Sequence, residues 1–205
     1  MSIMDIFAQL EQSRPAGGKP EWLIVGLGNP GKEYAGTRHN MGYMAIDKFA
    51  DMVSADFDRK NFGGVYTIVK HPSFSESFIL AKPETYMNLS GTFVRPLANY
   101  YRIPVEDILI VYDDMAIEEG SIRLRLSGSC GSHNGMRNVI DELQTEEIKR
   151  LRIGIGEPPF KGIDYVLSKP TGESLDKAEE ATDKAAKAIR DYLLHDFAYA
   201  MNHYN

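Results

Sequence analysis

Apolar residues recur along the chain in two patterns, namely short runs of strand length and stripes with the spacing of a helix. Residues 22–28 (WLIVGLG) and 107–114 (DILIVYDD) are apolar over most of their length, which is typical of strands buried on both faces. Residues 63–70 and 77–83 flank a polar loop and predict a hairpin. The other predicted strands are residues 121–127, which alternate as a strand with one exposed face does, and 150–156.

Helical stripes separate these strands. One apolar stripe runs through residues 41–53, and another through 93–101, with Ser90 as a candidate N-cap. Residues 133–144 predict a helix behind a loop rich in glycine and serine, and residues 173–197 predict a long amphipathic helix. Apolar strands separated by helices predict an α/β fold, in which a single domain has a mixed, mostly parallel twisted sheet with helices on both faces.

Residues 1–20 differ from the rest of the chain. Ile3, Ile6 and Leu10 have the spacing of a short amphipathic helix, and the segment SRPAGGKP that follows is typical of a flexible linker. We therefore expect an N-terminal appendage and linker at 1–20 and one domain at 21–205. The first residues resemble neither a signal peptide nor a transit peptide, and no apolar run approaches the ~20 residues that span a membrane, so a cytoplasmic protein without membrane association is expected.

Composition narrows the class of protein further. The chain has 205 residues, of which 43% are hydrophobic and 25% charged, as is ordinary for a globular domain. Its one cysteine, Cys130, excludes an internal disulfide and a cysteine-rich metal site, and we expect no metal. The net charge of −6 argues against broad, non-specific nucleic-acid binding but leaves room for a local basic patch.

A glycine pattern after the first predicted strand raises a nucleotide-binding alternative. Gly26, Gly28 and Gly31 fit G-x-G-x-x-G, the turn that binds the pyrophosphate of a dinucleotide. That fingerprint needs a helix that starts within the turn, whereas a polar loop continues here, and Asp47 and Asp51 lie on a helix rather than after a second strand. The glycines are better explained as turns that let the backbone pass close to a substrate. A nucleotide-dependent oxidoreductase stays an alternative that a test of NAD(P) and flavin binding decides.

Polar side chains gather in four loops that follow predicted strands. Each has a purely structural explanation as a turn former, a helix cap or a strand end, but together they converge on the edge where α/β sheets place their sites. Without a nucleophile elbow or a metal cluster, the natural chemistry is attack by water, with His39 as general base, a carboxylate to orient it, and amides to bind the oxyanion. These side chains are Asn29, His39, Asn88, Asp113, His133 and Asn134.

Five motifs together resemble those of the bacterial-type peptidyl-tRNA hydrolases in order and spacing. They are IVGLGNPGKEYAGTRHNMG, KPETYMNLSG, VYDDM, GSHNGMRNVI and RLRIGIGEPP, and the similarity runs from about Glu21 to the C-terminal helix. The resemblance implies a catalytic α/β domain at 21–205 that acts as a monomer without metal or cofactor. It implies hydrolysis of the ester between a peptide and the 3′-terminal ribose of tRNA, which recycles tRNA from peptides dropped by ribosomes. The acceptor stem and 3′ end of the tRNA are the expected contacts.

The resemblance also implies roles for individual residues. His39 matches the catalytic base, and Asp113 matches the carboxylate that orients this base and supports its protonated form. Asn29 and Asn88 match amides that hold the peptide backbone, the water and the transition state, and Asn134 matches an amide that helps fix the water and the 3′ end. Positions that line the cleft near the substrate are matched by Tyr34 and Met87, and tRNA-binding positions by Arg123, Arg125, His133, Arg152 and Lys161.

Two points keep other interpretations open. The loop SGSCGSHNG has Ser127, Ser129 and Ser132 where the family often has glycine, and a serine at positive φ would strain this loop. Relatives of this fold that assist RNA splicing share much of the motif set, so an RNA-binding protein without hydrolysis is the second hypothesis. Turnover of N-blocked aminoacyl-tRNA separates it from the first.

Overall fold

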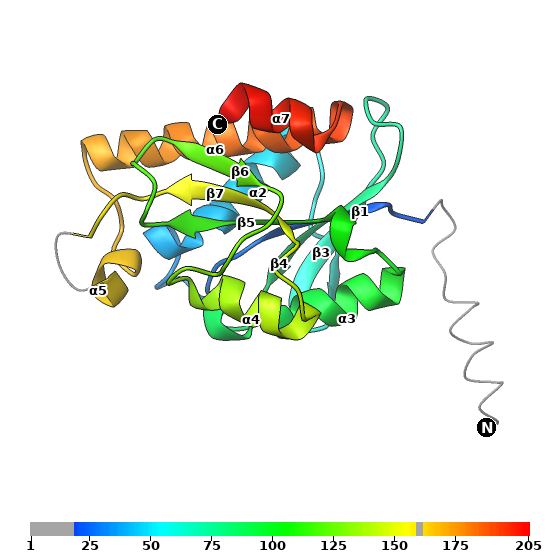
Figure 1. Cartoon of the computed structure of the whole chain (residues 1–205), viewed down its shortest axis with the longest axis horizontal. Helices are drawn as coiled ribbons and strands as arrows, with labels where there is room; N and C mark the ends of the chain where they lie inside the picture. The colour runs from blue at the N-terminus through cyan, green and yellow to red at the C-terminus, as the bar shows by residue number, and fades with distance from the viewer. Residues whose placement is uncertain (1–18, 159–161) are drawn as a thin grey trace.

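Seven strands form one mixed sheet at the centre of the protein (Figure 1). The computed structural model describes residues 19–158 and 162–205. The strands are β1 (Trp22–Gly26), β2 (Arg59–Asn61), β3 (Gly64–Val69), β4 (Phe78–Pro83), β5 (Ile108–Asp114), β6 (Ile122–Arg125) and β7 (Lys149–Gly154). They lie in the order β2-β3-β4-β1-β5-β7-β6. β4, β1, β5 and β7 run parallel, whereas β2, β3 and β6 pair antiparallel with their neighbours, which confirms the predicted mixed, mostly parallel sheet.

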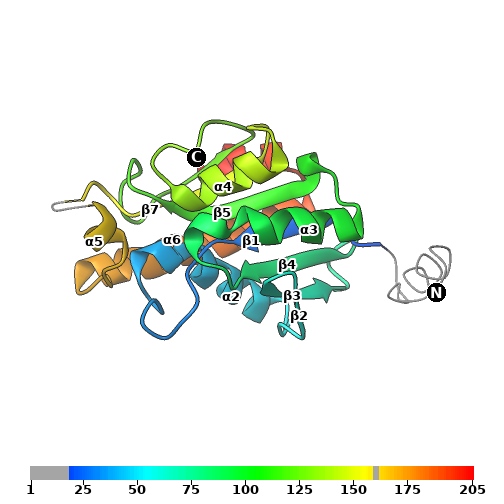
Figure 2. The same ribbon diagram turned by 90° about the horizontal axis from the view of Figure 1, so that it is seen from below.

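Helices cover both faces of the sheet, as Figures 1 and 2 show. One face packs against α2 (Met41–Met52), α6 (Glu173–Leu194) and α7 (Phe197–Tyr204), and the other against α3 (Gly91–Tyr101) and α4 (Asn134–Leu143). Alternation along β1 divides its side chains between two cores, because Ile24 faces the first layer while Leu23 and Val25 face the second. No helix in the described part of the chain is long and apolar enough to span a bilayer.

Two glycines let α2 approach the sheet closely. A Cβ atom on Gly42 would lie 2.3 Å from the carbonyl oxygen of Val111, and one on Gly26 would lie 2.3 Å from the carbonyl oxygen of Gly42. The first glycine of the G-x-G-x-x-G pattern therefore serves helix packing. The loop after β1 runs to the short 3-10 helix η1 (Arg38–Asn40) before α2 begins, so the glycine turn does not open a helix as a dinucleotide site requires.

Some local predictions need correction. The predicted helix 173–197 is two helices, because the chain turns at His195–Asp196 and the Asp196 carboxylate caps α7 by accepting from the backbone N–H of Tyr199. Ser90 lies at the N-cap of α3, yet its hydroxyl donates to the Met87 carbonyl instead of accepting from the helix. Strand β2 was not predicted. The helix predicted at residues 3–10 lies outside the described residues.

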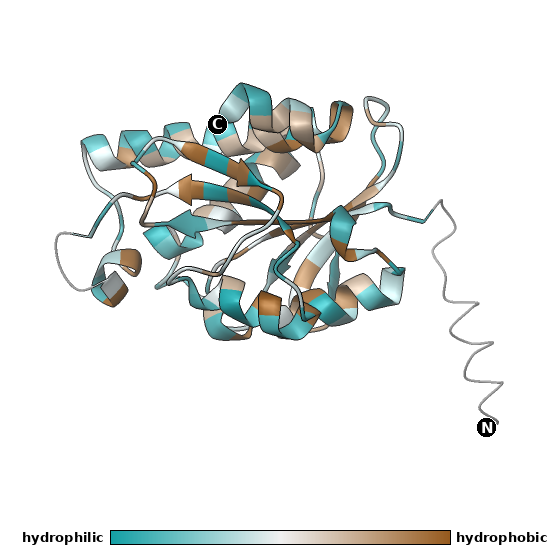
Figure 3. Ribbon diagram, viewed as in Figure 1, coloured by the Kyte–Doolittle hydropathy of each residue, from teal (hydrophilic) through white to brown (hydrophobic). Residues whose placement is uncertain are grey.

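The edge of the sheet formed by β7 and β6 has one apolar face and one basic face. On β6 and β7 the residues Leu124 and Leu151 belong to the core beneath α6 and α7. Alternate residues point to the opposite face, and Figure 3 shows the two strands coloured in alternating hydrophobic and hydrophilic bands. The side chains that the register pairs on this opposite face are Arg123 with Arg152, and Arg125 with Arg150.

Candidate active site

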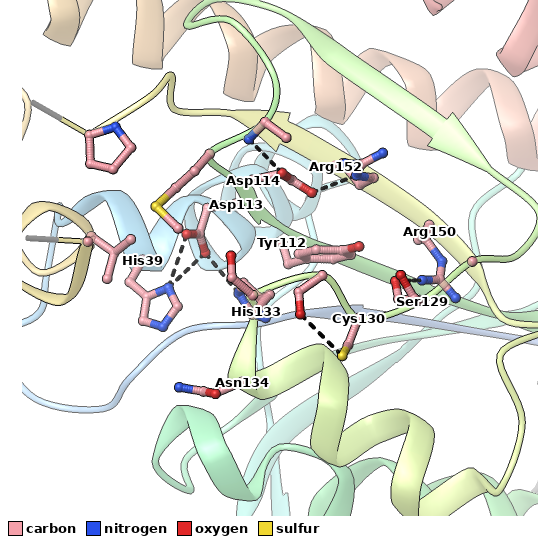
Figure 4. Close-up of a pocket in the computed structure, with 18 of the residues that line it drawn as sticks. His39, Tyr112, Asp113, Asp114, Ser129, Cys130, His133, Asn134, Arg150 and Arg152 are labelled. Carbon is pink, nitrogen blue, oxygen red and sulfur yellow. Dashed lines mark hydrogen bonds and ion pairs between the residues drawn. The ribbon is translucent and has the colours of Figure 1, made fainter.

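A cavity of about 880 Å³ opens beside the carboxyl ends of β5 and β7 and extends over the basic face of β6 and β7. Its walls come from β5, the loop 127–132, the start of α4, and α5 (Gly162–Val166). Figure 4 shows His39, Asp113 and His133 grouped at one end, with the arginines further along the strands. The predicted site residues that line this cavity are His39, Asp113, Arg125, His133, Asn134 and Arg152.

His39 and Asp113 form a buried hydrogen-bonded pair. His39 Nδ1 lies 2.9 Å from Asp113 Oδ1 and 3.1 Å from Oδ2. A carboxylate accepts only, so Nδ1 carries the hydrogen and Nε2 has a free lone pair when the ring is neutral. Both side chains are buried, with relative exposures of 9% for His39 and 2% for Asp113. This tautomer is the one that a histidine needs to accept a proton from water.

His133 joins the same carboxylate from the other side. It is the N-cap of α4, and its Nδ1 accepts from the backbone N–H of Met136 at 3.0 Å. Its Nε2 therefore carries the hydrogen and donates to Asp113 Oδ1 at 3.1 Å. Both ring nitrogens are thus engaged within the protein, so only the carbon edge or the face of the ring is open to the predicted contact with tRNA. His133 also helps to hold Asp113, a role that the sequence did not predict.

The carboxylate of Asp113 and the imidazole of His39 shift each other's pKa values. Burial on its own raises the pKa of Asp113, but the electrostatic attraction of the His39 and His133 rings and their hydrogen bonds outweigh it and hold the pKa well below its ordinary range. Burial on its own lowers the pKa of His39, but the charge of Asp113 and the hydrogen bond to it bring the pKa above its ordinary value. Asp113 is therefore ionised at neutral pH and stabilises a protonated His39.

Asn29 holds the loop that precedes His39. Its backbone N–H donates to Asn40 Oδ1 at 2.9 Å, and its carbonyl accepts from Asn40 Nδ2 at 3.0 Å. Its side-chain oxygen accepts from the backbone N–H of Met87 at 2.7 Å, which leaves Nδ2 as its side-chain donor. Asn40 was not among the predicted site residues. Its double hydrogen bond fixes η1 against the loop after β1, so it positions His39.

Three other predicted substrate residues, Tyr34, Met87 and Asn88, do not line the cavity. Met87 is buried in the 3-10 helix η2 (Met87–Leu89), and a Cβ atom on Gly135 would lie 2.4 Å from its sulfur, so η2 packs against the start of α4. Asn88 is exposed on η2, and Tyr34 is half-buried in the loop after β1. Asn134, the first residue of α4, is exposed and lines the cavity. The structure therefore gathers the amides around one edge but brings only Asn134 into the cavity wall.

The serine-rich loop has an unstrained backbone and a buried arginine beneath it. Gly128 and Gly131 are its positive-φ residues, at 142° and 55°, so none of its serines takes a positive φ and the strain considered above does not arise. Arg150, only 2% exposed, donates to the carbonyl oxygens of Ser129, Glu146 and Ile148. Arg150 was missed as a site residue. The available signal was a second arginine two residues before Arg152, on the same face of the same strand.

The predicted tRNA-contacting arginines differ in their surroundings. Arg125 is exposed in the cavity wall, and Arg123 is half-buried on the same strand outside it. Arg152 is half-buried, and its Nε donates to Asp114 Oδ2 at 2.6 Å. Lys161 lies outside the described residues.

His39, Asp113 and His133 are also close enough to be considered as metal ligands, since their nearest ligand atoms lie within 4.8 Å of one another. The hydrogen bonds argue instead for a carboxylate held by two histidines without a metal. A metal on His133 Nε2 would require a hydrogen on Nδ1, which would oppose the N–H of Met136. A metal on His39 Nδ1 would place the hydrogen on Nε2 and remove the base.

We therefore expect exhaustive chelation to leave the hydrolytic rate unchanged. The measurement is turnover of N-acetyl-aminoacyl-tRNA before and after treatment with EDTA, followed by gel filtration into metal-free buffer. Because Mg²⁺ also shapes tRNA, the assay is repeated on a short N-acetyl-aminoacyl-adenosine substrate. Loss of activity on both substrates, with recovery on adding one metal, would establish a metal centre.

Comparison with known proteins agrees with this geometry. A family model described as peptidyl-tRNA hydrolase matches residues 23–205. The peptidyl-tRNA hydrolase of Bacillus cereus (strain Q1) is 46% identical over 187 residues, a match that covers 89% of this chain and 98% of that protein, and the enzyme of Bacillus subtilis (strain 168) is 44% identical with 89% and 97% covered. The crystal structure of peptidyl-tRNA hydrolase from Acinetobacter baumannii is 35% identical, with a TM-score of 0.83 and 92% and 99% of the two chains covered. This chain belongs to the peptidyl-tRNA hydrolase family.

Proposed function

We propose that this peptidyl-tRNA hydrolase cleaves its ester with a water that His39 activates and Asp113 supports. The observation that carries the proposal is the tautomer of His39, whose Nδ1 donates to Asp113 and whose Nε2 is left to accept a proton. As Nε2 removes a proton from water, the water oxygen attacks the ester carbonyl. Asp113 stabilises the imidazolium that forms, and the collapse of the tetrahedral intermediate returns this proton to the ribose oxygen. The products are a peptide carboxylic acid and tRNA with a free hydroxyl.

Neutral amide side chains are suited to binding the peptide part of this substrate, whose sequence varies. The side chains of Asn29, Asn88 and Asn134 can bind the peptide main chain or the oxyanion without reading the peptide's side chains. Tyr34 and Met87 are proposed to border the peptide on the same edge. An ester is an easier target than an amide, so a water activated by one histidine suffices without a covalent intermediate.

Release of the acyl group from N-acetyl-aminoacyl-tRNA tests the proposal. We expect turnover of this substrate and little turnover of the unblocked aminoacyl-tRNA. In the unblocked form the α-amino group next to the ester is free, whereas in a peptidyl-tRNA this nitrogen is part of a peptide bond. Binding of both without any release would favour the alternative of an RNA-binding protein. Binding of NAD(P) or a flavin would favour the oxidoreductase alternative.

Arg123, Arg125, Arg152 and Lys161 are proposed to contact phosphates of the acceptor stem and 3′ end. Such contacts weaken with salt, with a log–log slope of roughly −0.7 to −0.9 for each neutralised phosphate. Replacing one of these residues by alanine is expected to raise KM on full-length tRNA more than it changes kcat, and to flatten the salt dependence. The control is Arg190→Ala, at an exposed position of α6, which should leave the slope of the salt dependence unchanged. An unchanged slope in all four variants would place the tRNA elsewhere.

Residues 1–20 are proposed to be an appendage that chemistry does not need, and the family match begins after them at residue 23. A protein that starts at Lys19 should keep the turnover rate of the full chain on N-acetyl-aminoacyl-tRNA. A truncated protein that melts normally but has lost catalysis would make the segment part of the site. We further propose that the enzyme is a cytoplasmic monomer, which sedimentation of the full chain and cell fractionation can test.

A further inference from the structure

The cavity wall contains an ion pair that the proposed chemistry does not use. Asp114 is the last residue of β5, and its Oδ2 accepts from Nε of Arg152 on β7 at 2.6 Å (Figure 4). Its other oxygen, Oδ1, accepts from the backbone N–H of Ala116 at 2.9 Å. The carboxylate is therefore fixed through both oxygens, and it fixes the edge of the guanidinium that carries Nε.

The two terminal nitrogens of this guanidinium are not used by the hydrogen bond to Asp114. Arg152 lines the cavity, and within residues 19–158 and 162–205 its two terminal nitrogens have no hydrogen bond or ion pair to protein. Those two nitrogens form the fork that binds a phosphate or carboxylate in bidentate fashion. Arg123 and Arg125 have no carboxylate partner in the same part of the chain, and each donates to a backbone carbonyl on its own strand. Arg152 is thus the arginine of this face that an acid holds in place.

We propose that Asp114 is a positioning residue that holds Arg152 in the orientation in which its terminal nitrogens meet a phosphate of the tRNA. The inference rests on the proposed tRNA contact of Arg152. A free arginine loses rotamer freedom when it binds, and a side chain fixed beforehand loses less. Asp114 also carries a negative charge that repels phosphate. The carboxylate bonds to Nε and to Ala116 and leaves the terminal nitrogens open, so we expect the gain in orientation to exceed the repulsion.

The position of Asp114 in the chain adds a mechanical consequence. It directly follows Asp113, so adjacent residues of one strand hold the general base and the phosphate-binding arginine. The strand β5 thereby sets the spacing between the reacting ester and one phosphate of the tRNA. Asp114 should therefore matter for a substrate with a tRNA body and not for a short substrate that lacks this phosphate.

The test is a double-mutant cycle of Asp114→Ala and Arg152→Ala on N-acetyl-aminoacyl-tRNA and on N-acetyl-aminoacyl-adenosine. Asp114→Ala is expected to raise KM on the tRNA substrate by about five- to tenfold, as loss of part of a charge-assisted contact does, with kcat within twofold. Its salt slope should flatten as it does in Arg152→Ala. Adding Asp114→Ala to Arg152→Ala should raise KM no further, since Asp114 acts through Arg152. Neither change should affect the short substrate.

Other outcomes overturn the inference in distinguishable ways. A lower KM in Asp114→Ala would mean that Asp114 screens Arg152, and additive effects would mean that the two act separately. If Arg152→Ala raises KM while Asp114→Ala does not, positioning fails and the tRNA contact stands. If Arg152→Ala has no effect on KM, then neither the positioning role of Asp114 nor the tRNA contact of Arg152 holds. The proposed hydrolysis by His39 does not depend on this result.

Two further variants separate positioning from stability. Asp114→Asn keeps an acceptor for Nε, so its KM should rise less than that of Asp114→Ala, and an equal rise would contradict the geometry. Asp183→Asn breaks the 2.5 Å ion pair with Lys48 between α6 and α2, away from the cavity, and should change neither KM nor the salt slope. Melting curves of all variants identify losses that come from unfolding.

Discussion

Replacing His39 by alanine is expected to lower kcat by roughly 10²–10⁴, the usual scale for a positioned general base. The reason is the hydrogen bond from Nδ1 to Asp113, which leaves Nε2 as the atom that takes the proton from water. Binding of peptidyl-tRNA should survive, because the amides and arginines that we propose to hold the substrate remain. Single-turnover kinetics at saturating enzyme measures this effect, since it follows the chemical step on bound substrate.

A matched histidine provides the control for this variant. His203 is exposed on α7 and interacts through Nδ1 with the carbonyl of Tyr199 on its own helix, so His203→Ala should keep the wild-type rate. If His39 only supported its loop, His39→Ala would lower the melting temperature and leave the single-turnover rate of the folded protein intact. A near-wild-type rate in folded His39→Ala ends the assignment of His39 as the base.

Replacing Asp113 by asparagine is expected to reduce kcat on a similar scale, roughly 10²–10⁴. An asparagine can donate its amide N–H to Nδ1 of His39, which would move the ring hydrogen to Nε2 and block the base. It also removes the negative charge that stabilises the imidazolium in the transition state. The measurement is again the single-turnover rate beside a melting curve, with Asp183→Asn as the control for losing a carboxylate elsewhere.

The pH profile of this variant carries the sharper test. His39 acts as a base only when neutral, and Asp113 raises its pKa, so wild-type activity should fall as pH drops through this raised value. Without the carboxylate the pKa of His39 falls, and the loss of activity should move to lower pH. Asn88→Ala should lower kcat without moving the profile, because the proposed role of Asn88 is to bind the oxyanion or the water and not to tune the base. A profile that does not move in Asp113→Asn would show that another group titrates.

The sequence by itself determined the order of the elements and the loops that carry the site. The apolar runs at 22–28 and 107–114 are typical of strands in a sheet covered on both faces. The polar residues that end these runs then lie at the carboxyl edge of the sheet. The family motifs then assigned His39 and Asp113, which the structure brings within hydrogen-bonding distance. The predicted end of the long C-terminal helix was wrong. The apolar stripe continues past His195, but the helical backbone stops at Leu194 and a second helix starts at Phe197.

Only the tertiary structure decided which polar groups meet. His133 shares Asp113 with His39, Asn40 clamps the loop of Asn29, and Asp114 holds Arg152 across neighbouring strands. A periodic pattern of apolar residues indicates on which face of its helix or strand a residue lies, and it therefore predicts whether that residue is buried. The partner of a buried polar group depends on the order and register of strands distant in the chain, and His39 and Asp113 are 74 residues apart. The tautomers of His39 and His133 follow from those partners, so the sequence identified the candidate base and the fold determined which of its ring nitrogens carries the hydrogen.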